Sequence, residues 1–166
     1  MSRITTSVSV PGSAAGPVDI RGPRFVAWIT TGVLVVVLLL AAVAPPAAAI
    51  LIAIQAVVFA SGAALGPRRH PYGLLYARLV APRLGPVTET EPAAPLRFAQ
   101  LLGFVFAAVS LLGFVLGDSV VGPLFAGFAL FAAFLNAAFG ICLGCKIYPL
   151  ATRLVPRSLS ESPAPN

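Results

Sequence analysis

The chain has 166 residues, of which 58% are hydrophobic and only 10% are charged. Soluble domains carry roughly 25% charged residues, so this composition excludes a water-soluble globule. It also excludes disorder over most of the length, because disorder requires low hydrophobicity. The composition is that of a small integral membrane protein.

The formal charge of +6 comes from eleven Lys and Arg residues against five Asp and Glu residues. Three long segments carry no charge at all, namely residues 25–65, 98–117 and 119–145. The cations therefore lie only between and outside the apolar segments, whereas a nucleic-acid module needs them on a folded, accessible face. We exclude nucleic acid as a partner and interpret the charges as topology signals for a protein of the lipid bilayer.

The first half of the chain predicts a tail and two spans. Residues 1–20 are rich in Ser, Thr, Gly, Pro and Val and are expected to be a disordered tail. The apolar segment that follows is long enough to cross twice, since one span needs roughly 20 residues. Pro45-Pro46 divides it, which predicts spans at residues 25–44 and about 47–65.

A linker over residues 66–97 comes next. Within it, Pro71 to Val80 mixes aromatic, aliphatic and basic residues and is expected to be a short helix on the membrane surface. Residues 85–95 hold three prolines and two glutamates and are expected to be an extended polar loop. His70 is expected to be a solvated interfacial residue.

The second half predicts spans at residues 98–116 and about 120–144, separated by Gly117-Asp118-Ser119, and then a mostly disordered tail over 151–166. The expected fold class is an all-α polytopic membrane protein. Its four transmembrane helices would form two antiparallel hairpins within a membrane domain of residues 21–150.

The cations near the span ends predict the orientation, because Lys and Arg favour the cytoplasmic side. All eleven lie before residue 25, in the linker or after residue 145, and the turns on the other side carry only Asp118. We therefore expect a multi-pass protein of the cytoplasmic membrane with both termini and the linker in the cytoplasm.

Among the polar residues inside the predicted spans, Gln55, Gln100, Ser110 and Asn136 are the candidates for a functional role. We favour hydrogen bonding between helices over a transport path for them. No acidic or basic residue lies within a span, which weighs against a proton-coupled carrier or a voltage sensor. The pairs Gly113/Gly117 and Gly140/Gly144 predict close helix approach, either within the chain or in a homo-oligomer.

Cys142 and Cys145 are the only cysteines and have C-x-x-C spacing. In a reducing compartment such a pair is more typical of redox or metal sites than of structural disulfides. The alternative is that both cysteines pack as small apolar side chains. The residues themselves leave both interpretations open.

The expected place of this pair, at the cytoplasmic C-terminus of the fourth span, complicates the redox interpretation. A helix C-terminus opposes thiolate formation, whereas the adjacent Lys146 favours it. Residues three apart in a regular helix have Cβ atoms about 5–6 Å apart, which is beyond the roughly 3.5–4.5 Å of a disulfide. An intramolecular disulfide is predicted under mild oxidation, with local unwinding that Gly144 and Pro149 would permit.

No metal or cofactor is expected. Zinc needs about four ligands, and beyond the two thiols the chain offers only His70 and scattered carboxylates. No catalytic serine motif, phosphate-binding glycine loop or haem attachment motif is present. If the protein is an enzyme, thiol chemistry is the strongest candidate.

The hairpin geometry also predicts which residues meet. Two helices joined by a short turn at residues 117–119 must run antiparallel. The Arg97/Gln100 end of the third span should therefore pack beside the Cys142/Cys145 end of the fourth.

Two stretches resemble the signatures of a known family. Residues 91–103 contain R-F-A-Q, and residues 136–148 contain G-x-C-x-G-C-x-x-Y. They look like an uncharacterised bacterial family of four-span membrane proteins, a domain of unknown function prominent in actinobacteria. The similarity covers about residues 21–150. Carried over residue by residue, the resemblance implies that the positions to test are Arg97, Gln100, Asn136, Cys142, Cys145 and Tyr148.

The resemblance implies no activity. Its relatives are often encoded near thioredoxin-like proteins or sulfurtransferases, which implies a soluble partner of that kind. Two hypotheses follow. In the first, Cys142 and Cys145, supported by Lys146, handle thiol, persulfide or disulfide equivalents. In the second, the protein is a non-catalytic membrane scaffold or small permease subunit in which the cysteines only pack.

Overall fold

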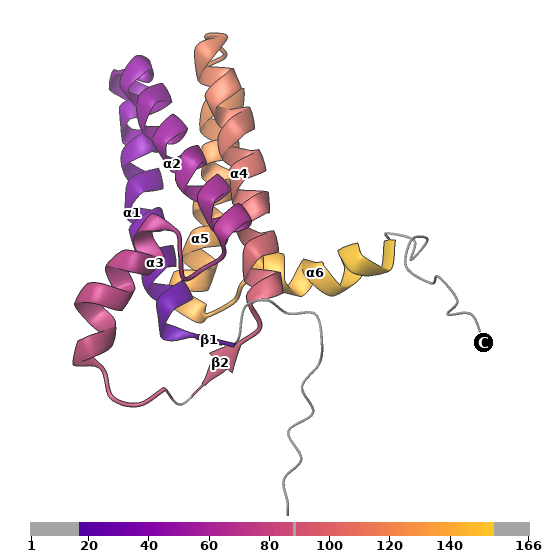
Figure 1. Cartoon of the computed structure of the whole chain (residues 1–166). Helices are drawn as coiled ribbons and strands as arrows, with labels where there is room; N and C mark the ends of the chain where they lie inside the picture. Colours follow the sequence, from indigo (N-terminus) through magenta and orange to yellow (C-terminus); the bar gives the residue numbers. More distant parts are fainter. Residues whose placement is uncertain (1–16, 88, 155–166) are drawn as a thin grey trace, which may run out of the picture.

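Four long helices dominate the computed structural model, which describes residues 17–87 and 89–154. They are α1 (Arg21–Val43), α2 (Pro45–Leu65), α4 (Ala93–Val115) and α5 (Val121–Phe139) (Figure 1). Each is long and apolar enough to cross a bilayer. Large aliphatic and aromatic side chains lie exposed along all four, as expected of surfaces that face lipid. The predicted all-α fold with four spans is confirmed.

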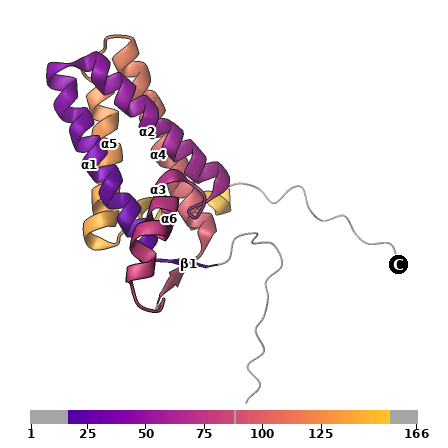
Figure 2. The same cartoon turned by 60° about the vertical axis from the view of Figure 1, so that its left-hand side comes forward.

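The four helices form a ring in which α1 contacts α2 and α5, and α4 contacts the same two helices from the opposite corner (Figure 2). Side chains from all four meet in one core cluster, which includes Leu34, Ile52, Phe59, Ala107 and Ala126. Neighbouring helices around the ring run in opposite directions, so the linker and both ends of the described chain lie at the same end of the bundle.

The hairpin turns agree with the sequence-based prediction. Ala44 alone separates α1 from α2, and Pro45 occupies the first position of α2, where a missing N–H costs nothing. In the second turn, Gly117 has a φ of 73°. The Asp118 Oδ1 atom accepts the backbone N–H groups of Val120 and Val121 at 2.8 Å each. These two bonds to the charged form hold the pKa of Asp118 below its ordinary value.

The N-terminal tail and the polar loop differ from expectation. Val18–Asp19 (β1) pairs antiparallel with Thr90–Glu91 (β2), with Val18 opposite Glu91. Residues 18–20 therefore belong to the fold, and the loop expected over 85–95 contains a strand and the first turn of α4. Helix α4 can begin early because Pro95 lies in its first turn, where proline is tolerated. The rest of the expected tail, residues 1–16, lies outside the described residues.

The linker between the hairpins is helical where a helix was expected. Helix α3 (Pro71–Leu75) continues into η1 (Tyr76–Val80) and η2 (Ala81–Arg83). Tyr76 is buried, with its ring centroid 5.7 Å from that of Phe25 on α1. This segment is thus docked on the start of α1 through Tyr76.

The predicted end of the fourth span is wrong. Helix α5 ends at Phe139, because Gly140 adopts the left-handed conformation (φ 67°) and caps the helix. A separate helix, α6 (Leu143–Leu154), then leaves the bundle sideways (Figure 1). The expected tail beyond residue 154 lies outside the described residues.

Candidate functional site

Cys142 and Cys145 lie at the start of α6 and form a disulfide, with Cα atoms 5.2 Å apart. Cys142 precedes the helix and Cys145 is its third residue. The backbone N–H of Cys145 donates to the Cys142 Sγ atom at 3.3 Å, and that of Lys146 to the Cys142 carbonyl oxygen at 3.1 Å. The expectation of a helix C-terminus is therefore corrected. The pair lies at a helix N-terminus, whose dipole favours a thiolate, and the disulfide requires no unwinding.

Gly144, between the two cysteines, is required for close packing and not for flexibility. A Cβ atom at this position would lie 2.6 Å from both the Cα and Cβ atoms of Ala99 on α4. The start of α6 is thus pressed against the backbone of α4. Gly140 and Gly144 do not form a packing pair on one helix, because Gly140 is the cap of α5.

Gln100, Asn136 and Cys142 line one cavity of about 560 Å³, which confirms the predicted meeting of the two span ends. The contact of Gly144 with Ala99 lies at the same level. Cys145 instead packs against a small apolar cluster of Val18, Ala93 and Leu96. The two sulfur-bearing residues therefore have different surroundings, one on the cavity wall and one against apolar side chains.

Arg97 and Tyr148 do not line this cavity. The Arg97 guanidinium donates to the carbonyl oxygens of Ala63 at 2.9 Å and Ala64 at 2.5 Å, so it caps the C-terminus of α2. The Tyr148 ring centroid is 5.8 Å from that of Phe98. Both residues line a second hollow, between α2, α4 and α6. Through these contacts, Arg97 holds α2 against α4 and Tyr148 holds α6 against α4.

Lys146 is exposed on α6. Among the residues that the structure describes, no hydrogen bond or ion pair involves its side chain. Its expected support of the thiolate therefore rests on its adjacency to Cys145 alone.

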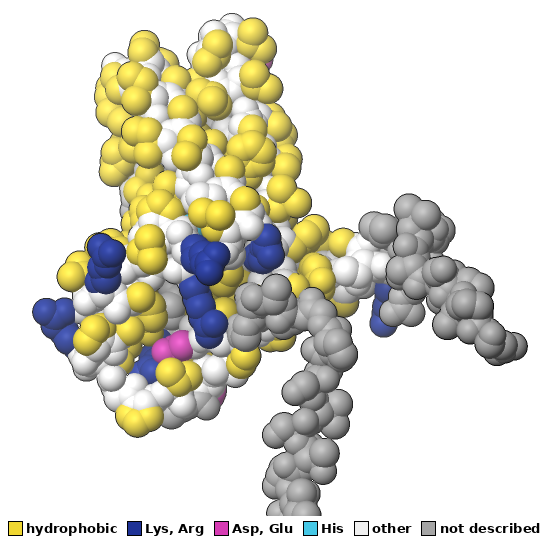
Figure 3. All heavy atoms as spheres, viewed as in Figure 1, with side chains coloured by type: hydrophobic (Ala, Val, Ile, Leu, Met, Phe, Trp, Pro, Cys, Tyr) yellow, Lys and Arg dark blue, Asp and Glu magenta, His cyan; other side chains and the backbone are white. Residues whose placement is uncertain are grey.

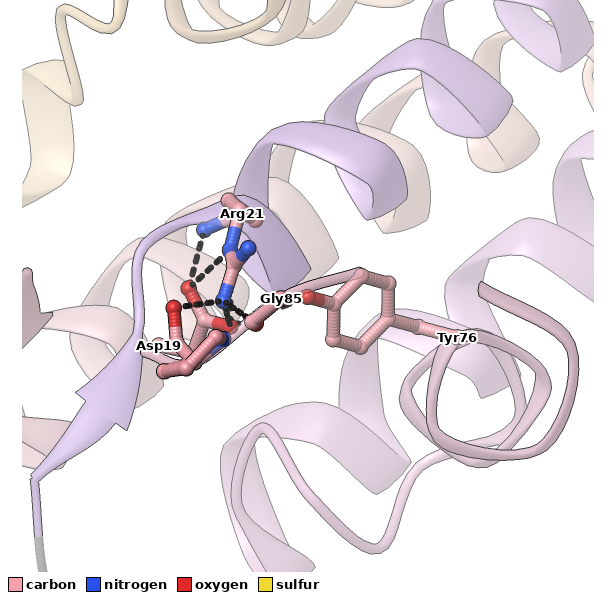
Figure 4. A network of polar contacts seen from close by, with 5 residues as sticks. Asp19, Arg21, Tyr76 and Gly85 are labelled. Atoms are coloured by element: carbon pink, nitrogen blue, oxygen red, sulfur yellow. Dashed lines mark hydrogen bonds and ion pairs between the residues drawn. The ribbon is translucent and has the colours of Figure 1, made fainter. Parts of the chain in front are cut away.

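A polar network, of which Asp19 and Tyr76 also line the cavity, was not foreseen from the sequence (Figure 4). The Arg21 guanidinium pairs with the Asp19 carboxylate at 2.9 Å and also donates to the Gly85 carbonyl oxygen at 3.2 Å. The Tyr76 hydroxyl donates to the same carboxylate at 3.1 Å. Hydrogen bonding from Arg21 holds the pKa of Asp19 below its ordinary value. Burial, followed by the Asp19 contact, raises the pKa of Tyr76.

His70 is also misplaced by the sequence-based interpretation. It is 1% exposed, so it is a buried residue and not a solvated one. Burial lowers its pKa, which favours the neutral imidazole. The turn from α2 into α3 folds it inward, and its ring lies 6.2 Å from that of Tyr72. No local pattern around Arg69-His70-Pro71 signals this burial.

Two polar residues within the spans make the expected contacts between elements. The Ser110 hydroxyl on α4 donates to the Gly122 carbonyl oxygen on α5 at 2.7 Å, at a point where Gly113 abuts the Gly122 backbone. The Gln55 Oε1 atom on α2 accepts the Tyr72 hydroxyl at 3.0 Å. For Gln100 and Asn136, no side-chain hydrogen bond joins them to another described residue.

The cations of the described chain gather at the cysteine end of the bundle, and the opposite end shows none (Figure 3). They are Arg21, Arg24, Arg68, Arg69, Arg78, Arg83, Arg97, Lys146 and Arg153. Arg3 and Arg157 lie outside the described residues. Within residues 17–87 and 89–154, no group of three His, Cys, Asp or Glu residues could hold a metal ion.

A family described as a domain of unknown function (DUF4395) matches residues 18–153. The match spans the strand pair, the four long helices and nearly all of α6, so the chain belongs to this family. No curated protein and no solved structure matches the chain.

Proposed function

We propose that this member of the DUF4395 family exchanges thiols and disulfides with a soluble cytoplasmic protein through Cys142 and Cys145. The proposal is supported by the position of Cys142 immediately before α6, where its Sγ atom accepts a hydrogen bond from the Cys145 N–H. An amide N–H and a helix N-terminus both stabilise a thiolate, which is the nucleophilic form of cysteine. The Cα separation of 5.2 Å falls within the range of disulfides.

The unequal surroundings of the two cysteines favour an order of events. The Cys142 thiolate attacks one sulfur of the partner's disulfide, and the other partner sulfur leaves as a thiolate that takes up a proton. Cys145, on losing its proton, then attacks the Cys142 sulfur. The Cys142–Cys145 disulfide forms and the partner leaves as a dithiol. The same steps in reverse oxidise a reduced partner and return Cys142 and Cys145 to thiols.

We further propose that the cysteine end faces the cytoplasm in the cytoplasmic membrane. Nine cations of the described chain support this orientation, since Lys and Arg are retained on the cytoplasmic side. A thioredoxin-like protein or a sulfurtransferase is the kind of soluble partner that such a face would meet. In this reducing compartment the cysteine pair would alternate between dithiol and disulfide and would not remain a structural disulfide.

Single-cysteine variants test the order of attack. In membranes at pH 7, Cys142 in Cys145→Ser should react with iodoacetamide about tenfold faster than Cys145 in Cys142→Ser. This ratio corresponds to about 1.4 kcal/mol of preferential thiolate stabilisation, within the range of up to ~2 kcal/mol for a partly buried helix terminus.

The same variants should differ with a small protein disulfide as the substrate. Cys145→Ser should accumulate a mixed disulfide through Cys142, and Cys142→Ser should not. Equal alkylation rates, together with the absence of any mixed disulfide in either variant, would favour the scaffold hypothesis, in which the cysteines only pack.

A further inference from the structure

The cavity beside Cys142 has the size and lining of a small-molecule site. Its volume of about 560 Å³ falls within the roughly 300–1,000 Å³ of such sites. It is bounded by all four long helices, by the linker and by the segment that leads into α6, and its walls inside the bundle are mostly apolar. Those inner walls include Phe59, Phe106, Ala129, Ala132 and Ala133.

The polar groups on the cavity wall indicate a neutral ligand with carbonyl oxygens. Gln100 and Asn136 present neutral amides, whose NH₂ groups donate, and neither side chain bonds to another described residue. The charged lining residues, Asp19 and Arg68, come from β1 and the linker, outside the four long helices, and so do the buried His70 and Tyr76. A charged ligand would lose its hydration among the apolar inner walls without an opposite charge to replace it.

The cavity is also lined by a cysteine. Cys142 lines the same cavity as the two amides, so a ligand held there lies against one member of the cysteine pair. A dithiol that closes to a disulfide gives up two electrons and two protons. Among neutral, apolar, membrane-soluble molecules with carbonyl oxygens, quinones accept that number of each.

We infer that the cavity binds a membrane quinone, which oxidises the reduced Cys142/Cys145 pair; this inference rests on the proposed function. Gln100 and Asn136 hold the quinone carbonyl oxygens, and the apolar inner walls enclose the ring. The protein then passes electrons from a cytoplasmic dithiol to the quinone pool of the bilayer.

The Cys142 thiolate adds to a ring carbon of the quinone and forms an S–C bond. Cys145 loses its proton and attacks the Cys142 sulfur, so the S–S bond forms while the S–C bond breaks. The electron pair of the S–C bond passes to the ring, whose oxygens take up two protons. Two thiols and one quinone become one disulfide and one hydroquinone.

The test uses the full-length protein in liposomes, reduced and freed of reductant, with decyl-ubiquinone as the probe. Disulfide formation is followed by mass spectrometry of the alkylated protein, and hydroquinone by its absorbance. The wild type should form one hydroquinone per disulfide. Ala132→Phe, which fills the cavity, and Asn136→Leu, which removes an amide, should each slow this oxidation at least tenfold. Ala42→Phe, on an exposed position of α1 outside the cavity, should leave it unchanged.

Two control reactions separate the possible failures. Oxidation by diamide and exchange with a small protein disulfide should proceed at wild-type rates in all three variants, which also shows that they are folded. The quinone inference is wrong if the wild type exchanges disulfides but is not oxidised by decyl-ubiquinone. It is also wrong if decyl-ubiquinone oxidises both cavity variants as fast as the wild type. In either case the proposed function stands. If the wild type fails in exchange as well, the proposed function fails too.

Discussion

Replacing Gly144 by alanine is expected to destabilise the protein and to disturb the cysteine pair. The added Cβ would lie 2.6 Å from the Cα and Cβ atoms of Ala99, and backbone cannot rotate away as a long side chain can. Overpacking of this kind typically costs about 1–3 kcal/mol. Because α6 must move from α4 to relieve the contact, Cys142 should leave the cavity wall.

The measurement is thermal unfolding in detergent together with the rate of thiol exchange. Tm should fall by roughly 2–4 °C for each kcal/mol lost, and the exchange rate should fall with it. Gly32→Ala is the matched control, because a Cβ at Gly32 meets nothing within 4 Å. An unchanged Tm and exchange rate in Gly144→Ala would mean that α6 is not held against α4.

Replacing Gly113 by alanine should weaken the second hairpin. A Cβ on Gly113 would lie 2.9 Å from the Gly122 Cα atom and 3.0 Å from the Val121 carbonyl carbon. Separation of α4 from α5 would also break the bond from the Ser110 hydroxyl to the Gly122 carbonyl oxygen. We expect overpacking to lower the free energy of unfolding by about 1–3 kcal/mol.

Thermal unfolding of Gly113→Ala beside Gly127→Ala checks this expectation. Gly127 lies on α5, where a Cβ meets nothing within 4 Å, so its substitution should be neutral or slightly stabilising. Equal Tm values for the two variants would contradict the close approach of α4 to α5 at Gly113.

The features that follow from hydropathy were predictable from the sequence. The bilayer dictates the length of an apolar helix, so the four spans and their hairpins could be placed by counting residues. The placement of Gln100 and Cys142 on one cavity followed from antiparallel geometry alone. These predictions need only local composition and chain direction.

The boundary at Gly140 could not be found in the same way. Apolar residues continue through Phe139 to Leu143, and nothing in hydropathy distinguishes a glycine inside a helix from one that ends it. The end of α5 depends on a positive φ at that residue. This single boundary moved the cysteines from a helix C-terminus to an N-terminus and reversed the expected effect of the dipole on Cys142.

Long-range contacts explain the remaining differences. Asp19 was expected to lie in the tail and Arg21 directly after it, but they meet Tyr76 and Gly85 across more than fifty residues of chain. His70 is buried because the linker folds back onto the bundle. Pairings between distant polar residues leave no periodic signal in the sequence.

We propose that a reversible cysteine pair faces the cytoplasm. Labelling with a membrane-impermeant maleimide in right-side-out and inverted vesicles, before and after reductant and after diamide, tests both the orientation and the reversibility. We predict that Cys142 and Cys145 are labelled only in inverted vesicles, and only when reduced, with diamide restoring full protection. Labelling in right-side-out vesicles would contradict the orientation, and labelling that diamide leaves unchanged would contradict the thiol chemistry.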